Sequence, residues 1–362
     1  MSISKVAVIG SGSWGTAVSG LLGLHADQVM IWSHDQEIAD YINEHHRNPV
    51  QLNTYTMLDC VSASTDYQSV LKDAQAIVMV VPSQFIRACA QAAQPYVDSQ
   101  TPVLILTKGI ENHTNYTMSE VLSEVWGNPA RIAVLSGPNH AEEICKGKIS
   151  AAVIASTHAS VAQFFQRLIM NENFRIYLSD DVVGVELCAA IKNVVAIACG
   201  ICIGLGYGDN ALAVLMTRGL AEISRIVIAK GGKSLTCMGL AGMGDLIATC
   251  TSVHSRNRSF GCAFSQGESL QEYEQRTSMV VEGARAALST QELCKKLSIE
   301  SPLTNSVYSV LYEHAKLEDV IALLLERIPT KNFMVCQQTI RRVHSWIHIP
   351  FALRRQCCPP IL

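Results

Sequence analysis

Seven short runs of apolar residues recur through the first half of the chain, separated by segments with helical spacing. The runs are KVAVIG, QVMIW, AIVMVVP, PVLILTKG, ARIAVLSGP, SAAVIAS and FRIYLS. Each run is brief and almost wholly apolar, which is typical of strands that are covered on both faces. Between the first two runs, the segment GTAVSGLLGLHA carries the helical spacing. The alternation predicts βαβ units in a parallel, doubly wound sheet of the α/β class.

The strand pattern ends at about Val183, and the apolar segments that follow have helical spacing. The longest of them would begin at an Asp209-Asn210 N-cap and end at the pair Gly231-Gly232. The sequence therefore predicts three regions: a sheet domain at 1–182, an all-α domain at 183–328 and a basic C-terminal tail at 329–362. The tail contains aromatic residues and cysteines and has weak periodicity. It would be either an amphipathic helix that touches a partner or a membrane surface, or a poorly ordered tail, and its role stays open.

Composition narrows the class of protein. The 362 residues carry a net charge of −3 and scattered Lys and Arg, so no nucleic-acid partner is expected. The chain opens directly on a strand pattern without a signal peptide, and its longest apolar run, 194–206, is too short to span a bilayer. The 13 cysteines have no framework spacing, and Cys199-x-x-Cys202 lies in an apolar run, which favours core packing over a metal site. We expect a cytoplasmic protein with reduced cysteines, no metal and no integral membrane segment.

Gly10, Gly12 and Gly15 form a G-x-G-x-x-G motif directly after the first predicted strand and at the start of a helix. In this context the first glycine permits a tight turn, and the second lets a pyrophosphate approach the backbone. The third lets the helix pack closely on the strand. The N–H groups and the dipole at the start of the helix favour the anion. The motif predicts a dinucleotide cofactor.

The end of the second predicted strand would contact the adenine ribose of that cofactor. Enzymes that use NAD often place a carboxylate there, whereas this chain has Ser33, His34 and Asp35. His34 would lie beside a 2′-phosphate, and Asp35 would reach a ribose hydroxyl. The pattern leans towards NADP and leaves NAD open.

Lys192 interrupts the apolar helical segment Val185–Gly200, in which Glu186 and Asn193 are the other polar residues. A buried ammonium group is costly unless it is paired. Hydride transfer to a carbonyl needs a proton donor for the developing alkoxide, and the reverse reaction needs a base. Desolvation and a second ammonium group would both lower the pKa of a lysine towards neutrality. Lys192 is therefore a candidate acid/base, and the alternative is a lysine whose stem packs while its head reaches solvent.

Further candidates follow predicted strands or glycine-containing loops. Lys108 ends the run PVLILTKG, at the edge where open parallel sheets bind ligands. Gly137-Pro138 follows a later strand and would open a helix whose N–H groups face a ligand. Asp245 follows Gly239, Gly242 and Gly244, and it would either cap the next helix or orient Lys192. For each of them an ordinary turn, cap or surface position is the alternative.

A basic loop brings Ser255, Arg256 and Asn257 together in the sequence SRNR. Hydroxyl, guanidinium and amide groups suit phosphate oxygens, because the guanidinium fork matches their geometry. The loop therefore predicts a phosphate on the substrate, against the alternative of a solvated basic turn.

The combination of these motifs resembles one family. GSGSWGTA, TKGIE, SGPNHAEE, GVELCAAIKNVVAIACGI, GLAGMGDLIATC, SRNR and VVEG stand in the order seen in bacterial-type NAD(P)-dependent glycerol-3-phosphate dehydrogenase. The resemblance runs from Lys5 to about Ile328. The set IKN, GMGDL, SRNR and VEG is specific to that family, whereas many families share the glycine turn.

The resemblance implies reversible reduction of dihydroxyacetone phosphate to sn-glycerol 3-phosphate with NADPH or NADH, feeding glycerophospholipid synthesis. It implies an N-terminal Rossmann-type domain followed by an all-α domain, usually as a homodimer. By similarity Lys192 is the catalytic proton donor and acceptor. The implied substrate contacts are Lys108, Gly137, Asn139, Lys192, Asp245, Ser255, Arg256 and Asn257. The implied dinucleotide contacts are Gly10, Gly12, Ser13, Trp14, Gly15, His34, Lys108, Ala141, Arg256, Val280 and Glu282.

The chain departs from the family pattern in two places. The family usually has G-P-S-F-A where this chain has GPNHA, with Asn139 and His140 at the altered positions. The tail after Ile328 has no counterpart in the pattern. Two other readings remain: a related dehydrogenase of the ketopantoate reductase or 3-hydroxyisobutyrate dehydrogenase kind, and a non-catalytic dinucleotide sensor. The SRNR loop argues against carboxylate substrates, and the joint presence of the lysines, Asp245 and Arg256 argues against a sensor.

Overall fold

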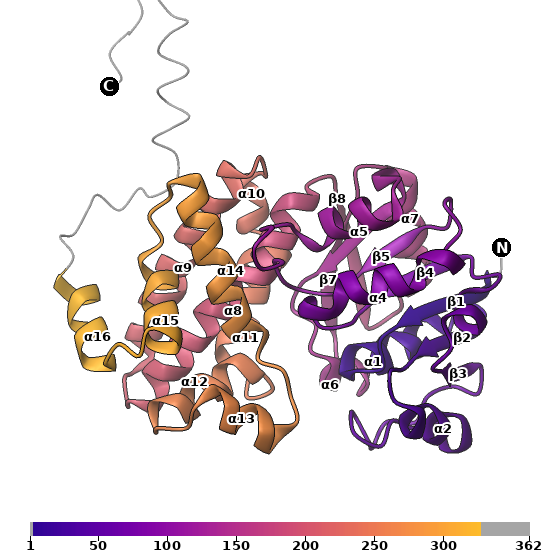
Figure 1. Cartoon of the computed structure of the whole chain (residues 1–362), viewed down its shortest axis with the longest axis horizontal. Helices are drawn as coiled ribbons and strands as arrows, with labels where there is room; N and C mark the ends of the chain where they lie inside the picture. Colours follow the sequence, from indigo (N-terminus) through magenta and orange to yellow (C-terminus); the bar gives the residue numbers. More distant parts are fainter. Residues whose placement is uncertain (1–2, 327–362) are drawn as a thin grey trace, which may run out of the picture. The chain divides into compact units, whose positions relative to one another are not determined.

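A computed structural model describes residues 3–326, so the predicted tail at 329–362 lies outside the described residues. The N-terminal part holds a single sheet of eight strands in the order β3-β2-β1-β4-β5-β6-β7-β8 (Figure 1). The strands are β1 (Ile3–Ile9), β2 (Ala26–Trp32), β3 (Val61–Ser64), β4 (Ala76–Met79), β5 (Val103–Ile105), β6 (Ile132–Ser136), β7 (Ser150–Ala155) and β8 (Phe174–Ser179). All seven predicted strands are present. The sequence analysis missed β3, because VSAS is short and alternates small apolar residues with serine.

The sheet is mixed, which corrects the prediction of a wholly parallel one. Strands β1 to β6 pair in parallel, for example Val6 beside Val29 of β2 and beside Ala76 of β4. Strand β7 runs antiparallel to β6 and parallel to β8. The connection from β6 to β7 contains only the four-residue helix α6 (Ala141–Ile144). A parallel connection usually needs a full crossover helix, so the chain turns back instead.

Helices cover both faces of the sheet, which explains why the strands are apolar on both sides. One core cluster contains apolar residues of α1 (Ser13–Leu22), α2 (Gln36–His45) and α7 (Ala159–Ile169). The opposite cluster contains residues of α3 (Tyr67–Leu71), α4 (Ile86–Ala93) and α5 (Met118–Trp126). The carboxyl ends of β1, β4 and β5 therefore open onto loops between these layers, where a doubly wound fold binds its ligands.

The C-terminal part is helical from residue 182 to residue 326, as predicted (Figure 1). Its helices are α8 (Val182–Gly204), α9 (Asp209–Ala229), α10 (Ser234–Cys237), α11 (Asp245–Thr251), α12 (Arg256–Ser265), α13 (Leu270–Thr277), α14 (Glu282–Leu297), α15 (Pro302–Tyr312) and α16 (Leu317–Glu326). Helix α9 begins one residue earlier than an N-cap at Asp209 would give. Gly208 is its N-cap and Asp209 is its first helical residue, while Gly231 adopts the positive φ that ends it.

Helix α8 forms the centre of the helical part. It packs against α9, α11, α12 and α14, as well as against β6, and 18 of its residues are buried. A helix that is apolar all round belongs in a core. Among the described residues α8 is also the one helix long and apolar enough to cross a membrane, but 89% of its most apolar window is buried inside the fold. Cys199 and Cys202 of α8 are buried free thiols, as the prediction of core packing requires.

Candidate active site

The glycine turn after β1 has the geometry of a phosphate cradle. Gly10 has φ +124°, and a Cβ there would lie 3.0 Å from the carbonyl group of Val80. A Cβ on Gly15 would lie 1.9 Å from the Gly10 carbonyl oxygen, so the close approach of α1 to β1 requires glycine. Gly12 is the N-cap of α1 and no side chain caps this helix end. A Cβ on Gly12 would meet nothing within 4 Å, so open space lies beside the uncapped start of α1, where backbone N–H groups favour an anion.

The side chains of residues next to the glycine turn and the end of β2 differ in their contacts and exposure. The Ser13 hydroxyl donates to Gln51 (2.6 Å), and the half-buried Trp14 ring lies 6.5 Å from that of Phe174. His34 is exposed two residues after the end of β2. Asp35 accepts the Glu37 N–H at 2.8 Å and caps α2. The Asp35 carboxylate is thus engaged with its own helix, which weakens the interpretation that it binds the ribose.

The buried lysine of α8 meets an aspartate. Lys192 Nζ donates to Asp245 Oδ1 and to Thr249 Oγ1 (2.6 Å), both on α11. Lys108, from the loop after β5, donates to Asp245 Oδ2 at 2.9 Å, and Ser136 at the end of β6 donates to the same oxygen at 3.0 Å. Lys192 and Asp245 are 5% and 2% exposed. One carboxylate therefore joins two lysines that come from different parts of the fold.

Burial and charge set the protonation of this cluster. The pKa of Lys192 is lowered to about 8: desolvation is the main cause and the nearby Lys108 ammonium adds to it, while Asp245 opposes both. Burial alone would raise the pKa of Asp245, but the charges of Lys108 and Lys192 outweigh burial and bring that pKa below its usual value. Asp245 is therefore ionised, and Lys192 can gain or lose a proton near neutral pH. Asp245 is the first residue of α11, and Gly244 is its N-cap.

The segment after β6 brings an unsatisfied amide to the site. Gly137 has φ +157°, and a Cβ there would lie 2.7 Å from the Ala152 Cα. Asn139 is 4% exposed, and its Nδ2 has no hydrogen-bond partner among the described residues. A buried amide donor without a partner is costly, so a ligand atom is the natural partner. Helix α6 begins only at Ala141, which corrects the prediction that Gly137-Pro138 opens the helix directly.

His140 connects this segment with α11. Its Nε2 lies 3.4 Å from the Ala248 carbonyl oxygen, and its ring centroid lies 6.3 Å from that of His254. Burial lowers the pKa of His140, and the charges of Lys192 and Lys108 lower it further. His140 is therefore neutral beside the lysines at neutral pH.

The predicted phosphate loop is the first turn of α12, which corrects its description as a loop. Ser255 is the N-cap and accepts the Arg258 N–H at 3.3 Å. Arg256 is exposed. Asn257 is 8% exposed, and its Oδ1 accepts the Gly283 N–H at 2.8 Å. The helix start adds its own N–H groups and dipole to the guanidinium group, which strengthens the case for an anion there.

Glu282 is the first residue of α14 and contacts the sheet domain. Its carboxylate accepts the Ser83 N–H (3.2 Å) and the Ser83 hydroxyl (2.6 Å). Burial raises the pKa of Glu282, although Ser83 and the charges of Arg256 and Arg285 oppose the rise. Glu282 is therefore no ordinary surface residue. Val280, just before it, is half-buried.

Sequence reasoning missed several groups at this site, namely Ser83, Ser136 and Thr249. Ser83 and Ser136 lie at or just beyond the carboxyl ends of β4 and β6, a position that predicts ligand contact only once the strand order is known. Thr249 stands four residues after Asp245 on one helix face, and that spacing was a usable signal. Within residues 3–326 no group of three or more His, Cys, Asp or Glu side chains has the arrangement of a metal site.

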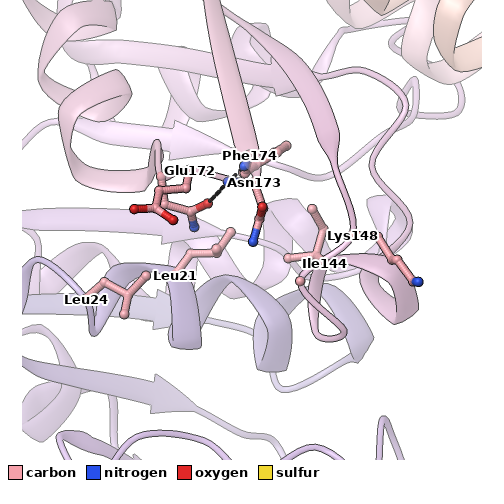
Figure 2. Close-up of a pocket in the computed structure, with 9 residues that line it drawn as sticks. Leu21, Leu24, Ile144, Lys148, Glu172, Asn173 and Phe174 are labelled. Atoms are coloured by element: carbon pink, nitrogen blue, oxygen red, sulfur yellow. Dashed lines mark hydrogen bonds between the residues drawn. The ribbon is translucent and has the colours of Figure 1, made fainter.

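A separate hollow lies on the sheet domain (Figure 2). It has a volume of about 290 Å³, and its lining includes Leu21, Ile144, Lys148, Glu172 and Phe174. None of the predicted site residues lines it, so it plays no part in the site described above.

The chain matches one family over most of its length. Residues 5–162 match the N-terminal domain of NAD-dependent glycerol-3-phosphate dehydrogenase, and residues 181–322 match the C-terminal domain. The chain is 42% identical over 330 residues to glycerol-3-phosphate dehydrogenase (NAD(P)+) of Clostridium perfringens, covering 91% of this chain and 99% of that protein. The corresponding protein of Bacillus pumilus is 41% identical over 330 residues, which is 91% of this chain and 96% of that protein.

Solved structures agree with this match. The glycerol-3-phosphate dehydrogenase of Coxiella burnetii superposes with a TM-score of 0.85 at 35% identity, covering 90% of this chain and 99% of that one. A ketopantoate reductase of Ralstonia eutropha has a TM-score of 0.57 at 17% identity, covering 85% and 97% of the two chains. The second likeness shows a shared fold only.

A dinucleotide-binding sheet joined to a helical domain with a buried lysine–aspartate centre defines an oxidoreductase that uses NAD or NADP. The matches to known proteins narrow this class to one family. The chain belongs to the NAD-dependent glycerol-3-phosphate dehydrogenase family, which confirms the resemblance seen in its motifs.

Proposed function

We propose that this protein catalyses the reversible reduction of dihydroxyacetone phosphate to sn-glycerol 3-phosphate with NADPH or NADH. One observation carries the proposal: buried Lys192, with a pKa of about 8, meets Asp245, which also binds Lys108. The family membership supports the substrate, because the relatives carry this activity in their names.

Lys192 would donate the proton that the carbonyl oxygen needs as it becomes a hydroxyl, and it would accept that proton in the reverse direction. The bound dinucleotide supplies or receives the hydride. Asp245 and Thr249 hold Lys192 Nζ from two sides, so the ammonium group is fixed before substrate arrives. Lys108 would stabilise negative charge at the same oxygen, and its charge keeps the pKa of Lys192 low.

The substrate phosphate would bind at the start of α12. Arg256 provides the exposed guanidinium group, and Ser255 and Asn257 flank it in the same turn. Gly137 and the unpaired Asn139 amide would contact the three-carbon part of the substrate. A phosphate anchored at one end places the carbonyl at a fixed distance from the lysine, which is the positional advantage that a bound substrate needs.

The dinucleotide would lie along Gly10, Gly12 and Gly15, with its remaining contacts at Ser13, Trp14, His34, Lys108, Ala141, Arg256, Val280 and Glu282. Gly12 gives the clearest support, because its helix end is open and uncapped. Exposed His34 is compatible with a 2′-phosphate or a free ribose hydroxyl, so both NADP and NAD remain candidates.

The setting of the reaction also belongs to this proposal. We propose a cytoplasmic homodimer that feeds glycerophospholipid synthesis, with a dinucleotide domain at 1–182 and a substrate domain at 183–328. The break between β8, which ends at Ser179, and α8, which starts at Val182, supports that division.

The test compares dihydroxyacetone phosphate with unphosphorylated dihydroxyacetone, each with NADPH and with NADH, by the loss of nicotinamide absorbance. We expect rapid oxidation of the nucleotide only with the phosphorylated substrate. Oxidation with ketopantoate but not with dihydroxyacetone phosphate would identify a carboxylate reductase instead. Tight nucleotide binding without turnover on any of them would leave a sensor and overturn the proposal.

A further inference from the structure

Glu186 is a buried carboxylate that the proposed mechanism does not use. It lies on α8, six residues before Lys192, and is 6% exposed. Its oxygens accept the backbone N–H of Ser119 at 2.8 Å and the Ser119 hydroxyl. Ser119 is the second residue of α5 in the sheet domain. Glu186 therefore joins the central helix of one domain to the start of a helix in the other.

The start of α5 is structurally continuous with the loop that carries Lys108. Thr117 is the N-cap of α5 and forms an antiparallel bridge with Ile110. Ile110 stands two residues after Lys108 and packs in the same core cluster as Leu187 of α8. The two ends of the loop are thus joined to each other, and a contact that fixes Ser119 also fixes the base of the Lys108 loop.

The surroundings of Glu186 make its burial costly. The pKa of Glu186 is raised to about 7: desolvation is the main cause and the nearby charge of Glu120 adds to it, while hydrogen bonds from Ser119 and Thr117 oppose the rise. Glu120 itself pairs with Lys230 of the α9 C-cap at 3.1 Å. At pH 8 an amide of the same shape would avoid the cost of burying the charge. Stability of the fold therefore does not explain a carboxylate at this position. The two charge-assisted hydrogen bonds that it makes across the domain boundary do explain it.

We propose that Glu186 is a positioning residue for the reaction: its ionised carboxylate holds the N-terminus of α5, and with it the Lys108 loop, at the place where Lys108 meets Asp245. The inference rests on the proposed function. Glu186 touches neither of the proposed ligands and acts only through Ser119. Protonation of Glu186 replaces a charge-assisted pair by weaker neutral bonds, so the position of Lys108 becomes looser as the pH falls through about 7.

The main test is Glu186→Gln, which keeps the shape and removes the charge. At pH 8 we expect kcat/KM for dihydroxyacetone phosphate to fall about fivefold, the difference between a charged and a neutral pair. The dissociation constant of the dinucleotide should not change. As the pH falls from 7 towards 5.5 the variant and the wild type should converge, because the wild-type carboxyl becomes protonated over this range. The substrate phosphate also titrates near pH 6, but it does so equally in both proteins.

Glu292→Gln is a matched control. Glu292 on α14 accepts the His113 N–H (3.1 Å) and the Asn115 Nδ2–H (3.3 Å) of the same loop, but its side chain is 30% exposed. We expect less than a twofold effect, equal at every pH. Ser119→Ala is a second, milder variant that keeps the backbone N–H and removes the hydroxyl donor. It should show a smaller loss with the same dependence on pH.

Thermal unfolding provides a readout that does not need activity. Glu186 titrates near 7 in the folded protein and near 4.5 in the unfolded chain, so the folded state binds more protons between these values. A rise in pH across that range therefore lowers the stability of the wild type, and Glu186→Gln removes this loss. The Tm of the variant relative to the wild type should rise between pH 5 and pH 8.

Two outcomes would overturn the positioning role while the wild type is active: an unchanged kcat/KM at pH 8 in Glu186→Gln, or an equal loss at every pH. An equal loss would mean that the side chain acts by packing alone. A wild type that does not reduce dihydroxyacetone phosphate would overturn the proposed function instead. The two failures are therefore distinguishable in one set of measurements.

Discussion

Replacing Lys192 by methionine tests the centre of the proposed mechanism. Methionine has a similar length and no charge, so it fills the space in α8 without a new cavity. Asp245 keeps its contacts with Lys108 (2.9 Å) and Ser136 (3.0 Å), so no buried charge is left unpaired. The variant should fold, and its loss of function should report the missing proton donor.

The structure gives the size of the effect. Burial and neighbouring charges lower the pKa of Lys192 from 10.5 to about 8, which corresponds to roughly 3 kcal/mol in favour of the neutral form. This shift puts the proton in the range where a general acid is effective, and such proton transfer contributes about a hundredfold to ten-thousandfold to a rate. We expect kcat to fall within that range, while the dissociation constant of NADPH changes less than threefold.

The assay is the pH dependence of both directions from pH 6 to pH 10. Reduction needs protonated Lys192, so its kcat/KM in the wild type should fall as the pH rises through about 8. Oxidation needs the neutral amine and should rise through the same pH. Lys192→Met should lack this titration. An equal loss of turnover and of NADPH binding, or a titration near pH 8 that survives in the variant, would refute the assignment.

Three further results are expected. Arg256→Ala should raise KM for dihydroxyacetone phosphate about tenfold to a hundredfold, which is the effect of losing a charged hydrogen bond. The slow use of unphosphorylated dihydroxyacetone should not change. An unaltered KM for the phosphorylated substrate would mean that the phosphate binds elsewhere. Thr249→Val removes the hydroxyl that lies 2.6 Å from Lys192 Nζ. In steady-state assays kcat should fall about fivefold, and NADPH binding should not weaken. A variant with weaker NADPH binding and an unchanged kcat would contradict the role of Thr249 in holding Lys192. Gly15→Ala would place a Cβ 1.9 Å from the Gly10 carbonyl oxygen and should weaken NADPH binding, measured by nucleotide fluorescence. Gly208→Ala is the control, because the exposed Gly208 has a negative φ and no atom within 4 Å of the added Cβ.

The sequence predicted the parts of the fold that depend on local pattern. The apolar runs located seven strands because a strand buried on both faces is apolar throughout. The pattern missed β3, which has only four residues and alternates small apolar residues with serine. It also missed the direction of β7, because strand direction depends on how the chain crosses the sheet. The hydrophobic pattern of a strand does not reveal whether the strand runs parallel or antiparallel to its neighbour.

The site was predictable in its residue types and less so in its contacts. Asp245 read equally well as a helix cap and as a partner of Lys192, and only the packing of α11 on α8 places its carboxylate against the lysine. The SRNR segment read as a loop because its polar residues hide the start of α12. Ser119 and Ser83 gave no signal, since each acts on a carboxylate that is far away in sequence.

Because the two lysines come from different domains, activity requires that both domains are present and assembled. Lys108 comes from the sheet part and Lys192 from the helical part, so neither half alone contains the charge arrangement that lowers the pKa of Lys192. A nascent or proteolysed chain that contains only one half would have no catalytic activity, even if that half folds and binds nucleotide. Mixing separately produced halves should restore turnover only where they dock, which makes the reaction itself a measure of assembly.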